Sequence, residues 1–182
     1  KRAKELGMKA IAITEHGNCF EWFKKKSCCE ENGIKYIHGA EFYVTETLDE
    51  KIKDNYHCCL YAKNYNGFLE LNKLISKSFN REDNSFYYSP RISLEDLFGT
   101  SNNIIITTAC LGGFFGKGSD DLQSKVVSFM QQNKDRCFLE IQPHLVEKQI
   151  KLNKKLYDIH KTTGIRLMVG TDTHALNDIH AK

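Results

Sequence analysis

The stretch KAIAITEHG, residues 9–17, is the most informative segment for the fold class. Its first six residues form a short apolar run that suits a buried strand. The run ends in a carboxylate and an imidazole, Glu15 and His16, at the point where such a strand would leave its sheet. In parallel α/β folds the carboxyl ends of the strands share one rim, and active sites are assembled there. The stretch therefore predicts a buried strand that delivers a functional side chain to a rim.

The rest of the chain repeats this alternation of strand and helix. It predicts further strands at residues 34–37 (extended again over 41–45), 56–62, 103–107, 136–141 and 166–169. It predicts helices at residues 1–7, 19–31, 68–79, 93–97, 122–130 and 146–160, with a polar and aromatic loop over 80–92. Such alternation favours an α/β fold with a parallel sheet and helices outside, either open or closed into a barrel. Because no linker interrupts it, we expect a single domain over residues 1–182.

Both ends of the sequence have the pattern of an interrupted helix. Residues 1–7 resemble the end of a helix with its stop and have no initiating Met before them, and residues 177–182 resemble the start of another helix. We therefore expect a domain truncated at both ends.

The composition excludes several classes of protein. Hydrophobic residues make up 41% and charged residues 27%, which is typical of a globular protein rather than a disordered one. No apolar stretch is long enough to span a membrane. Seven cysteines with two adjacent pairs, Cys28–Cys29 and Cys58–Cys59, suit reduced thiols, so we expect a cytoplasmic protein. The net charge of +3 is too small to predict a nucleic-acid groove.

Side chains that can bind metals follow the predicted strands or, in one case, begin one. They are His16, Glu41, His57, Cys110, Asp172 and His174. Asp172 and His174 alternate in an extended segment, so they point to the same side. Imidazole, carboxylate and thiolate together suit Zn²⁺ or a similar divalent metal. Taken singly, each residue has an ordinary interpretation, such as a hydrogen-bonded loop histidine or a buried cysteine. Their convergence on one rim favours a metal site.

Six segments add a resemblance to these inferences. They are AIAITEHGN (10–18), GAEFYV (39–44), YHCCLYAKN (56–64), SPRI (89–92), CLGG (110–113) and GTDTH (170–174). In this order they resemble motifs of the PHP (polymerase and histidinol phosphatase) domain in the α subunits of DNA polymerase III, the C-family replicative polymerases. The segments around Asn64, Pro90 and Leu111 favour the polymerase branch over stand-alone phosphatases.

This resemblance implies a fold and a ligand set. The fold would be a distorted (β/α)7 barrel of the PHP type, incomplete because the family's first strand, with a His-x-His pair and a following Asp, would precede Lys1. The family's metal ligands fall on His16, Glu41, His57, Cys110, Asp172 and His174. Glu15 stands where the family commonly has Asp, so the surroundings of His16 are altered.

The resemblance also implies an activity. The parent protein would be a DNA-directed DNA polymerase that contacts DNA and other replisome subunits. The domain itself would hydrolyse phosphoesters with clustered divalent metals, zinc first and manganese or magnesium as alternatives, and its substrate would be a mispaired 3′ end or pyrophosphate. Arg91 would clamp a phosphate if its loop folds over the rim, or else form an ordinary salt bridge.

Two other functions remain open at this stage. One is a stand-alone phosphatase of the histidinol-phosphate type, and the other is an inactive scaffold within the polymerase. Of the remaining histidines, His38, His160 and His180 are expected to be structural. His144 follows a predicted strand at the rim but matches no ligand of the family.

Overall fold

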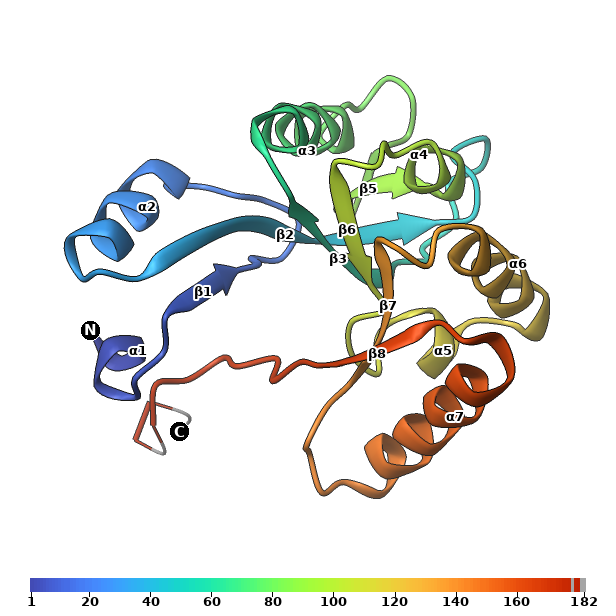
Figure 1. Ribbon diagram of the computed structural model, residues 1–182. Helices are drawn as coiled ribbons and strands as arrows, with labels where there is room; N and C mark the ends of the chain where they lie inside the picture. Colours follow the sequence, from blue (N-terminus) through green and yellow to red (C-terminus); the bar gives the residue numbers. More distant parts are fainter. Residues whose placement is uncertain (178, 181–182) are drawn as a thin grey trace.

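The computed structural model describes residues 1–177 and 179–180 (Figure 1). Its helices are α1 (Arg2–Glu5), α2 (Trp22–Glu31), α3 (Tyr65–Ser78), α4 (Leu94–Phe98), α5 (Phe114–Lys117), α6 (Asp120–Gln132) and α7 (Glu147–Thr163). Its strands are β1 (Ala10–Ile13), β2 (Lys35–Thr45), β3 (Tyr56–Ala62), β4 (Phe86–Tyr87), β5 (Ser89–Ser93), β6 (Ile104–Thr107), β7 (Cys137–Ile141) and β8 (Arg166–Val169).

The strands form one curved, mixed sheet in the order β4-β5-β2-β3-β6-β7-β8, with helices around its outside (Figure 1). The long strand β2 carries β1 beside its first half, where Ile13 pairs with His38, and β5 beside its last residues, where Arg91 pairs with Tyr43. Within the described part of the chain, β1 pairs only with β2 and β8 only with β7, so the curved sheet does not close. The structure therefore confirms an incomplete α/β barrel.

The direction of β3 corrects the expectation of a parallel sheet. β3 runs antiparallel to both of its neighbours, β2 and β6. The cause lies in its connections: residues 46–55 contain no helix, whereas parallel neighbours need a longer crossover, usually a helical one. Because β3 is reversed, its first residues lie at the rim where β2 and β6 end. His57, at the start of β3, reaches the rim for this reason.

Residues 80–92 also differ from the predicted loop, because they contain β4 and β5. The two strands pair as a tight hairpin, Phe86 with Pro90, and β5 then continues the sheet along β2. Asn84 and Tyr88 adopt left-handed backbone conformations, with φ of 62° and 61°. Short strands that contain a proline carry little periodic signal, so the sequence pattern concealed them.

Capping residues and the spacing of apolar residues explain where the helices begin and which face they bury. Asn64 caps α3 by accepting a hydrogen bond from the Gly67 amide, and Leu71 and Ile75 bury its inner face. The predicted short helix at 93–97 is confirmed as α4, whose Ser93 and Asp96 form a capping box. The four-residue helix α5 was not predicted, because it is too short to show a pattern.

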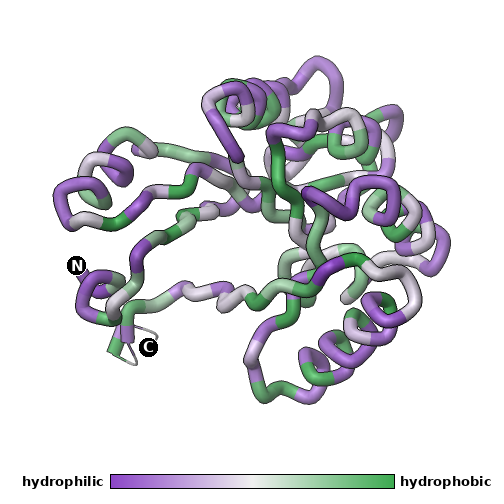
Figure 2. Tube along the Cα trace, viewed as in Figure 1, coloured by the Kyte–Doolittle hydropathy of each residue, from purple (hydrophilic) through white to green (hydrophobic). Residues whose placement is uncertain are grey.

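The hydrophobic core lies between the convex face of the sheet and the outer helices. Hydrophilic residues gather on the helices and loops outside it (Figure 2). Fully buried members from the strands and helices include Phe42, Leu60, Leu71, Ile92, Ile104, Leu122, Met130 and Leu139. Since side chains alternate along a strand, the residues between these core positions point to the opposite, concave face. That face carries the candidate site.

The chain ends agree only in part with the expectations. Residues 2–5 form the helix α1, as predicted. The helix expected at 177–182 is not seen where the chain is described, because residues 176–177 bend and 179–180 form a turn. Asp178, Ala181 and Lys182 lie outside the described residues. No helix in the described part is both long and apolar enough to cross a membrane.

Candidate metal centre

Glu41 lies at the centre of the predicted ligand set. It sits in the middle of β2 on the concave face and is only 4% exposed. Its Oε1 lies 3.2 Å from His57 Nδ1, and its Oε2 lies 3.1 Å from His16 Nε2. One carboxylate therefore faces two imidazoles, each with a different oxygen.

Cys110 joins this group from the loop after β6. Its Sγ lies 3.4 Å from His57 Nδ1, the same nitrogen that faces Glu41. The candidate ligand atoms of Glu41, His57 and Cys110 all lie within 4.8 Å of one another. A carboxylate oxygen, an imidazole nitrogen and a thiol sulfur at this spacing match the donor set of a transition-metal site.

The segment after β8 brings the last two predicted residues to the same rim. His174 Nε2 lies 3.4 Å from His16 Nε2. The other ring nitrogen of His174 donates to the Asp172 backbone oxygen at 2.8 Å, which leaves Nε2 directed at His16. The Asp172 carboxylate faces the His174 ring, with Oδ1 3.6 Å from Nδ1, rather than Glu41 or His16. Asp172 has a φ of 47°, so the simple alternation expected of an extended segment does not hold there.

Backbone pairing holds His16 against Glu41. The turn after β1 continues along β2, so that the Glu41 amide donates to Glu15 and the Gly17 amide donates to Glu41 at 2.7 Å. Gly17 has a φ of 66°, and a side chain there would press against Pro90. A glycine is therefore needed at the position that follows His16.

The CLGG loop holds His57 in a similar way. The His57 amide donates to the Gly112 carbonyl at 3.0 Å, and the Gly112 amide donates to Cys110 Sγ at 3.4 Å. A Cβ built on Gly112 would lie 2.8 Å from His57 Nδ1. The loop backbone thus packs directly on the imidazole, and only glycine leaves room for this contact.

The electrostatics of the cluster suit a cation. Hydrogen bonds that the protonated His57 ring donates to Cys110 and Glu41 raise the pKa of His57 to about 9, against the opposing effect of burial. The Glu41 Oε2 atom is buried and accepts no hydrogen bond among the described residues, although His16 Nε2 lies 3.1 Å away. A buried carboxylate oxygen that accepts no hydrogen bond is costly, and a bound divalent cation would compensate it. The residues present therefore fit a metal ion.

Arg91 does not reach this rim. Its guanidinium is 1% exposed and donates to the backbone oxygens of Ile52 and Asn84, with the Asp54 carboxylate at 3.4 Å. These contacts join the loop before β3 to the turn before β4. The structure gives a phosphate contact by Arg91 no support, because its Nη donors are engaged inside the protein.

The remaining histidines and Glu15 have local partners or none. His38 is buried between the Tyr36 hydroxyl and Asn72, both at 3.2 Å, as expected for a structural residue. His160 donates to the Ile165 carbonyl near the end of α7, His180 accepts from the Leu176 amide, and His144 is exposed. Glu15 turns toward Lys25 Nζ, at 2.5 Å.

One residue of the site was missed by the sequence reasoning. Tyr43 lies against both His16 and His57. Its signal was available in the sequence, because Tyr43 follows Glu41 by two positions in a strand and therefore shares its face.

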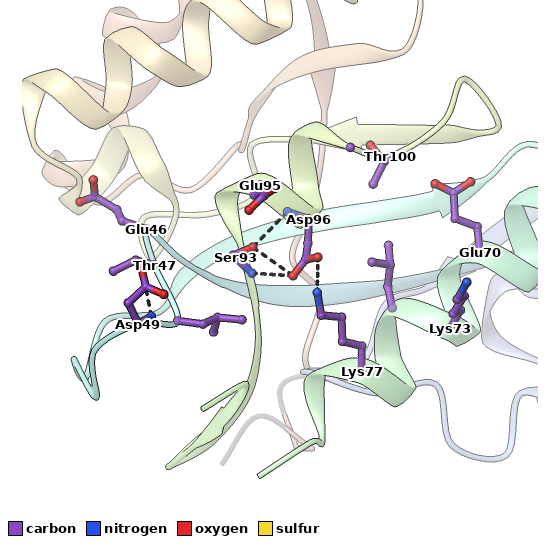
Figure 3. A pocket seen from close by; sticks show the side chains of 13 residues that line it. Glu46, Thr47, Asp49, Glu70, Lys73, Lys77, Ser93, Glu95, Asp96 and Thr100 are labelled. Atoms are coloured by element: carbon purple, nitrogen blue, oxygen red, sulfur yellow. Dashed lines mark hydrogen bonds and ion pairs between the residues drawn. The ribbon is translucent and has the colours of Figure 1, made fainter. Parts of the chain in front are cut away.

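A polar cavity lies away from this cluster (Figure 3). It measures about 830 Å³ and is bounded by α3, α4 and residues 46–49. Its lining is polar and partly self-paired, for example by the Lys77–Asp96 ion pair at 2.5 Å. None of the six predicted ligands lines it. The chemistry therefore points to the rim rather than to this cavity.

Comparisons with known proteins identify the family of the chain. The profile of the PHP domain matches residues 1–144. The chain is 33% identical over 187 residues to the DNA polymerase III subunit alpha of Borreliella burgdorferi. It is 32% identical to the corresponding subunits of Helicobacter pylori (strain 26695) and Aquifex aeolicus, over 192 and 193 residues. These alignments cover 96–97% of the chain, which spans about 16% of the length of each relative.

A solved structure resembles the fold. It is a proposed metal-dependent phosphoesterase from Bifidobacterium adolescentis, with a TM-score of 0.61 and 14% sequence identity. The match covers 96% of this chain and 80% of that protein. At this identity the likeness concerns the fold alone.

Proposed function

The chain belongs to the PHP domain family, and we propose that it is the PHP domain of a DNA polymerase III α subunit whose metal centre hydrolyses phosphoesters. The similarity of nearly the whole chain to such subunits supports the parent protein. The parent would act as a DNA-directed DNA polymerase in the cytoplasm, with DNA and other replisome subunits as partners. Polymerisation itself would reside in the rest of that protein.

The observation that carries the proposed activity is the placement of Glu41. This buried carboxylate faces His16 with one oxygen and His57 with the other, and the Cys110 thiol lies beside His57. Divalent metal ions at such a site lower the pKa of a bound water and neutralise charge on phosphoryl oxygens. Glu41, His57 and Cys110 would hold a metal ion, and His16 and His174 would add two imidazole ligands beside the other Glu41 oxygen. Asp172 would hold His174 in orientation and add a further carboxylate.

We propose zinc as the metal, with manganese and magnesium as alternatives. A thiolate and imidazoles favour zinc, whereas magnesium selects oxygen ligands and water. The thiol of Cys110 therefore disfavours magnesium in the group formed by Glu41, His57 and Cys110.

The full ligand set is proposed to include residues outside this chain. The sheet is open between β1 and β8 in the described residues, and the family resemblance places a strand with a His-x-His pair there. A longer chain that includes this strand should bind more zinc, and more tightly, than residues 1–182 alone. Equal and tight binding by both chains, measured by metal analysis after dialysis, would remove this part of the proposal.

The decisive experiment uses the full-length protein that carries this domain. Zinc-loaded protein is given a primer with a mispaired 3′ end, and release of nucleotides is measured for the native protein and for Glu41→Gln. Glu70→Gln serves as the control, because Glu70 is a carboxylate that binds Ser101 away from the rim. We expect Glu41→Gln to lose hydrolysis while primer extension and the control variant remain normal.

Two outcomes would reject the proposal. If Glu41→Gln hydrolyses the mispaired end as the native protein does, the hydrolysis belongs to another site. If the metal-loaded native protein hydrolyses neither this substrate nor pyrophosphate, the domain is a scaffold within the polymerase.

A further inference from the structure

Tyr43 occupies a position between two of the candidate ligands. It lies two residues beyond Glu41 on β2, so both side chains share the concave face. Across the sheet it pairs with His57 of β3. Side chains of directly paired residues lie side by side, which places the phenol ring next to the His57 imidazole.

The Tyr43 ring contacts both imidazoles. It stacks on His16 with ring centroids 6.4 Å apart and an angle of 10° between the planes. It meets His57 at 5.1 Å and 58°. The backbone that follows His16 also rests on this ring, since a Cβ on Gly17 would lie 3.4 Å from Tyr43 Cε2. These are the separations at which aromatic rings pack favourably.

Both imidazoles need something to hold their orientation. The terminal torsion of histidine is broad, so a ring with one free side can turn its nitrogens away from a ligand position. A metal-binding histidine is usually held by a hydrogen bond from its second ring nitrogen. His174 has such a bond, but among the described residues the second nitrogens of His16 and His57 have no recorded partner. Besides the Glu41 carboxylate, the Tyr43 ring is a contact that these two histidines share, and it packs on the ring planes rather than on the nitrogens.

We infer that Tyr43 is a positioning residue of the metal centre. Its ring fixes the planes of both imidazoles, so that His16 Nε2 and His57 Nδ1 face separate oxygens of Glu41. The aromatic ring performs this role, and the hydroxyl, which has no recorded hydrogen bond among the described residues, is not required. The inference rests on the proposed metal centre and adds a residue that sets the spacing of its two sides.

The test replaces the metal with Co²⁺, whose visible spectrum reports ligand geometry, in the full-length protein. Tyr43→Leu removes the ring, Tyr43→Phe removes only the hydroxyl, and Tyr36→Leu is the matched control. Tyr36 is a half-buried tyrosine of the same strand that packs on His38 rather than on the cluster. We expect Tyr43→Leu to weaken Co²⁺ binding by about 10-fold or more, the effect typical of losing a group that orients a ligand, and to alter the spectrum. Tyr43→Phe and Tyr36→Leu should match the native protein in both measurements.

The outcomes separate this inference from the proposed function. If the native protein binds Co²⁺ and Tyr43→Leu leaves affinity and spectrum unchanged, only the role of Tyr43 is rejected. It is also rejected if Tyr43→Phe is as impaired as Tyr43→Leu, or if Tyr36→Leu produces the same change. If the native protein does not bind Co²⁺ at all, the proposed metal centre fails and the inference fails with it.

Discussion

Replacing Gly112 with alanine tests the packing on which the candidate metal centre depends. The added methyl would lie 2.8 Å from His57 Nδ1, 2.9 Å from Cε1 and 3.0 Å from Cγ, directly on the imidazole face. Ordinary contact begins near 3.4 Å, so the ring must retreat by roughly half an ångström. Tyr43 packs on the same imidazole at 5.1 Å, so His57 has little freedom to retreat without turning away from Glu41 and Cys110.

The magnitude follows from two separate effects. Displacing a ligand by this amount should weaken metal binding by about 10- to 100-fold, the range seen when groups that orient a ligand are altered. Overpacking itself should lower the free energy of unfolding by about 1–3 kcal/mol. The backbone does not add to this, because Gly112 is not among the residues with positive φ and alanine can adopt its conformation.

The assay compares Gly112→Ala with the native protein by competition for zinc against a chromogenic chelator, together with thermal unfolding. Gly99→Ala is the control, since a methyl there meets the Glu95 carbonyl at 3.2 Å and the Asp96 carbonyl at 3.7 Å and lies away from the rim. We expect weaker zinc binding in Gly112→Ala alone. Native-like zinc affinity in a folded Gly112→Ala protein would refute the argument that this loop holds His57 in place.

Three further predictions follow from other contacts. Cys110→Ser should abolish the thiolate-to-metal charge-transfer band of the Co²⁺-loaded protein, and persistence of that band would assign it to another cysteine. Arg91→Met should lower the free energy of unfolding by about 3 kcal/mol, because it leaves the carbonyls of Ile52 and Asn84 without donors. Its zinc affinity should not change. A loss of zinc affinity in the folded variant would argue against a purely structural role of Arg91. Burial lowers the pKa of His38 below its ordinary value of 6.5. The stability that the neutral, buried His38 contributes is therefore complete above pH 6.5 and is lost as the pH falls from 6.5 through the lowered pKa. His38→Gln should therefore flatten the acid side of a plot of unfolding midpoint against pH, and an unchanged slope would contradict the burial argument.

The sequence was sufficient for most of the elements, and five of the six predicted ligands lie in mutual contact in the structure: His16, Glu41, His57, Cys110 and His174. β1, β3, β6, β7 and β8 begin and end within two residues of their predicted positions, because each is a compact apolar run between polar turns. The hairpin of β4 and β5 was missed, since it forms through pairing with β2 and not through a pattern of its own. Strand pairing is a tertiary property, and short polar strands reveal it poorly.

His57 lies at the rim, as predicted, but for a reason that the sequence pattern of a parallel sheet does not contain. The rule that active sites gather at the carboxyl ends of parallel strands excludes a residue at the start of a strand. His57 nevertheless lies at the rim because β3 is reversed, as the absence of a helix between β2 and β3 requires. The direction of β3 could have been predicted from the length of that connection. The face of the sheet on which Tyr43 lies could also have been predicted, but its contact with His57 could not, because it depends on the register of β2 and β3.

The two sides of the cluster differ in how completely the described chain encloses them. On one side, the side chains of Glu41 and His57 are 5% and 23% exposed, and Cys110 is held by the loop that packs on His57. On the other side, His16 and His174 are 51% and 62% exposed, and they come from segments next to the open edges of β1 and β8. Metal ligands work best when their orientation is fixed and water is largely excluded. The described residues therefore largely enclose Glu41 and His57 beside Cys110, whereas His16 and His174 stay mostly exposed next to the open edges of the sheet.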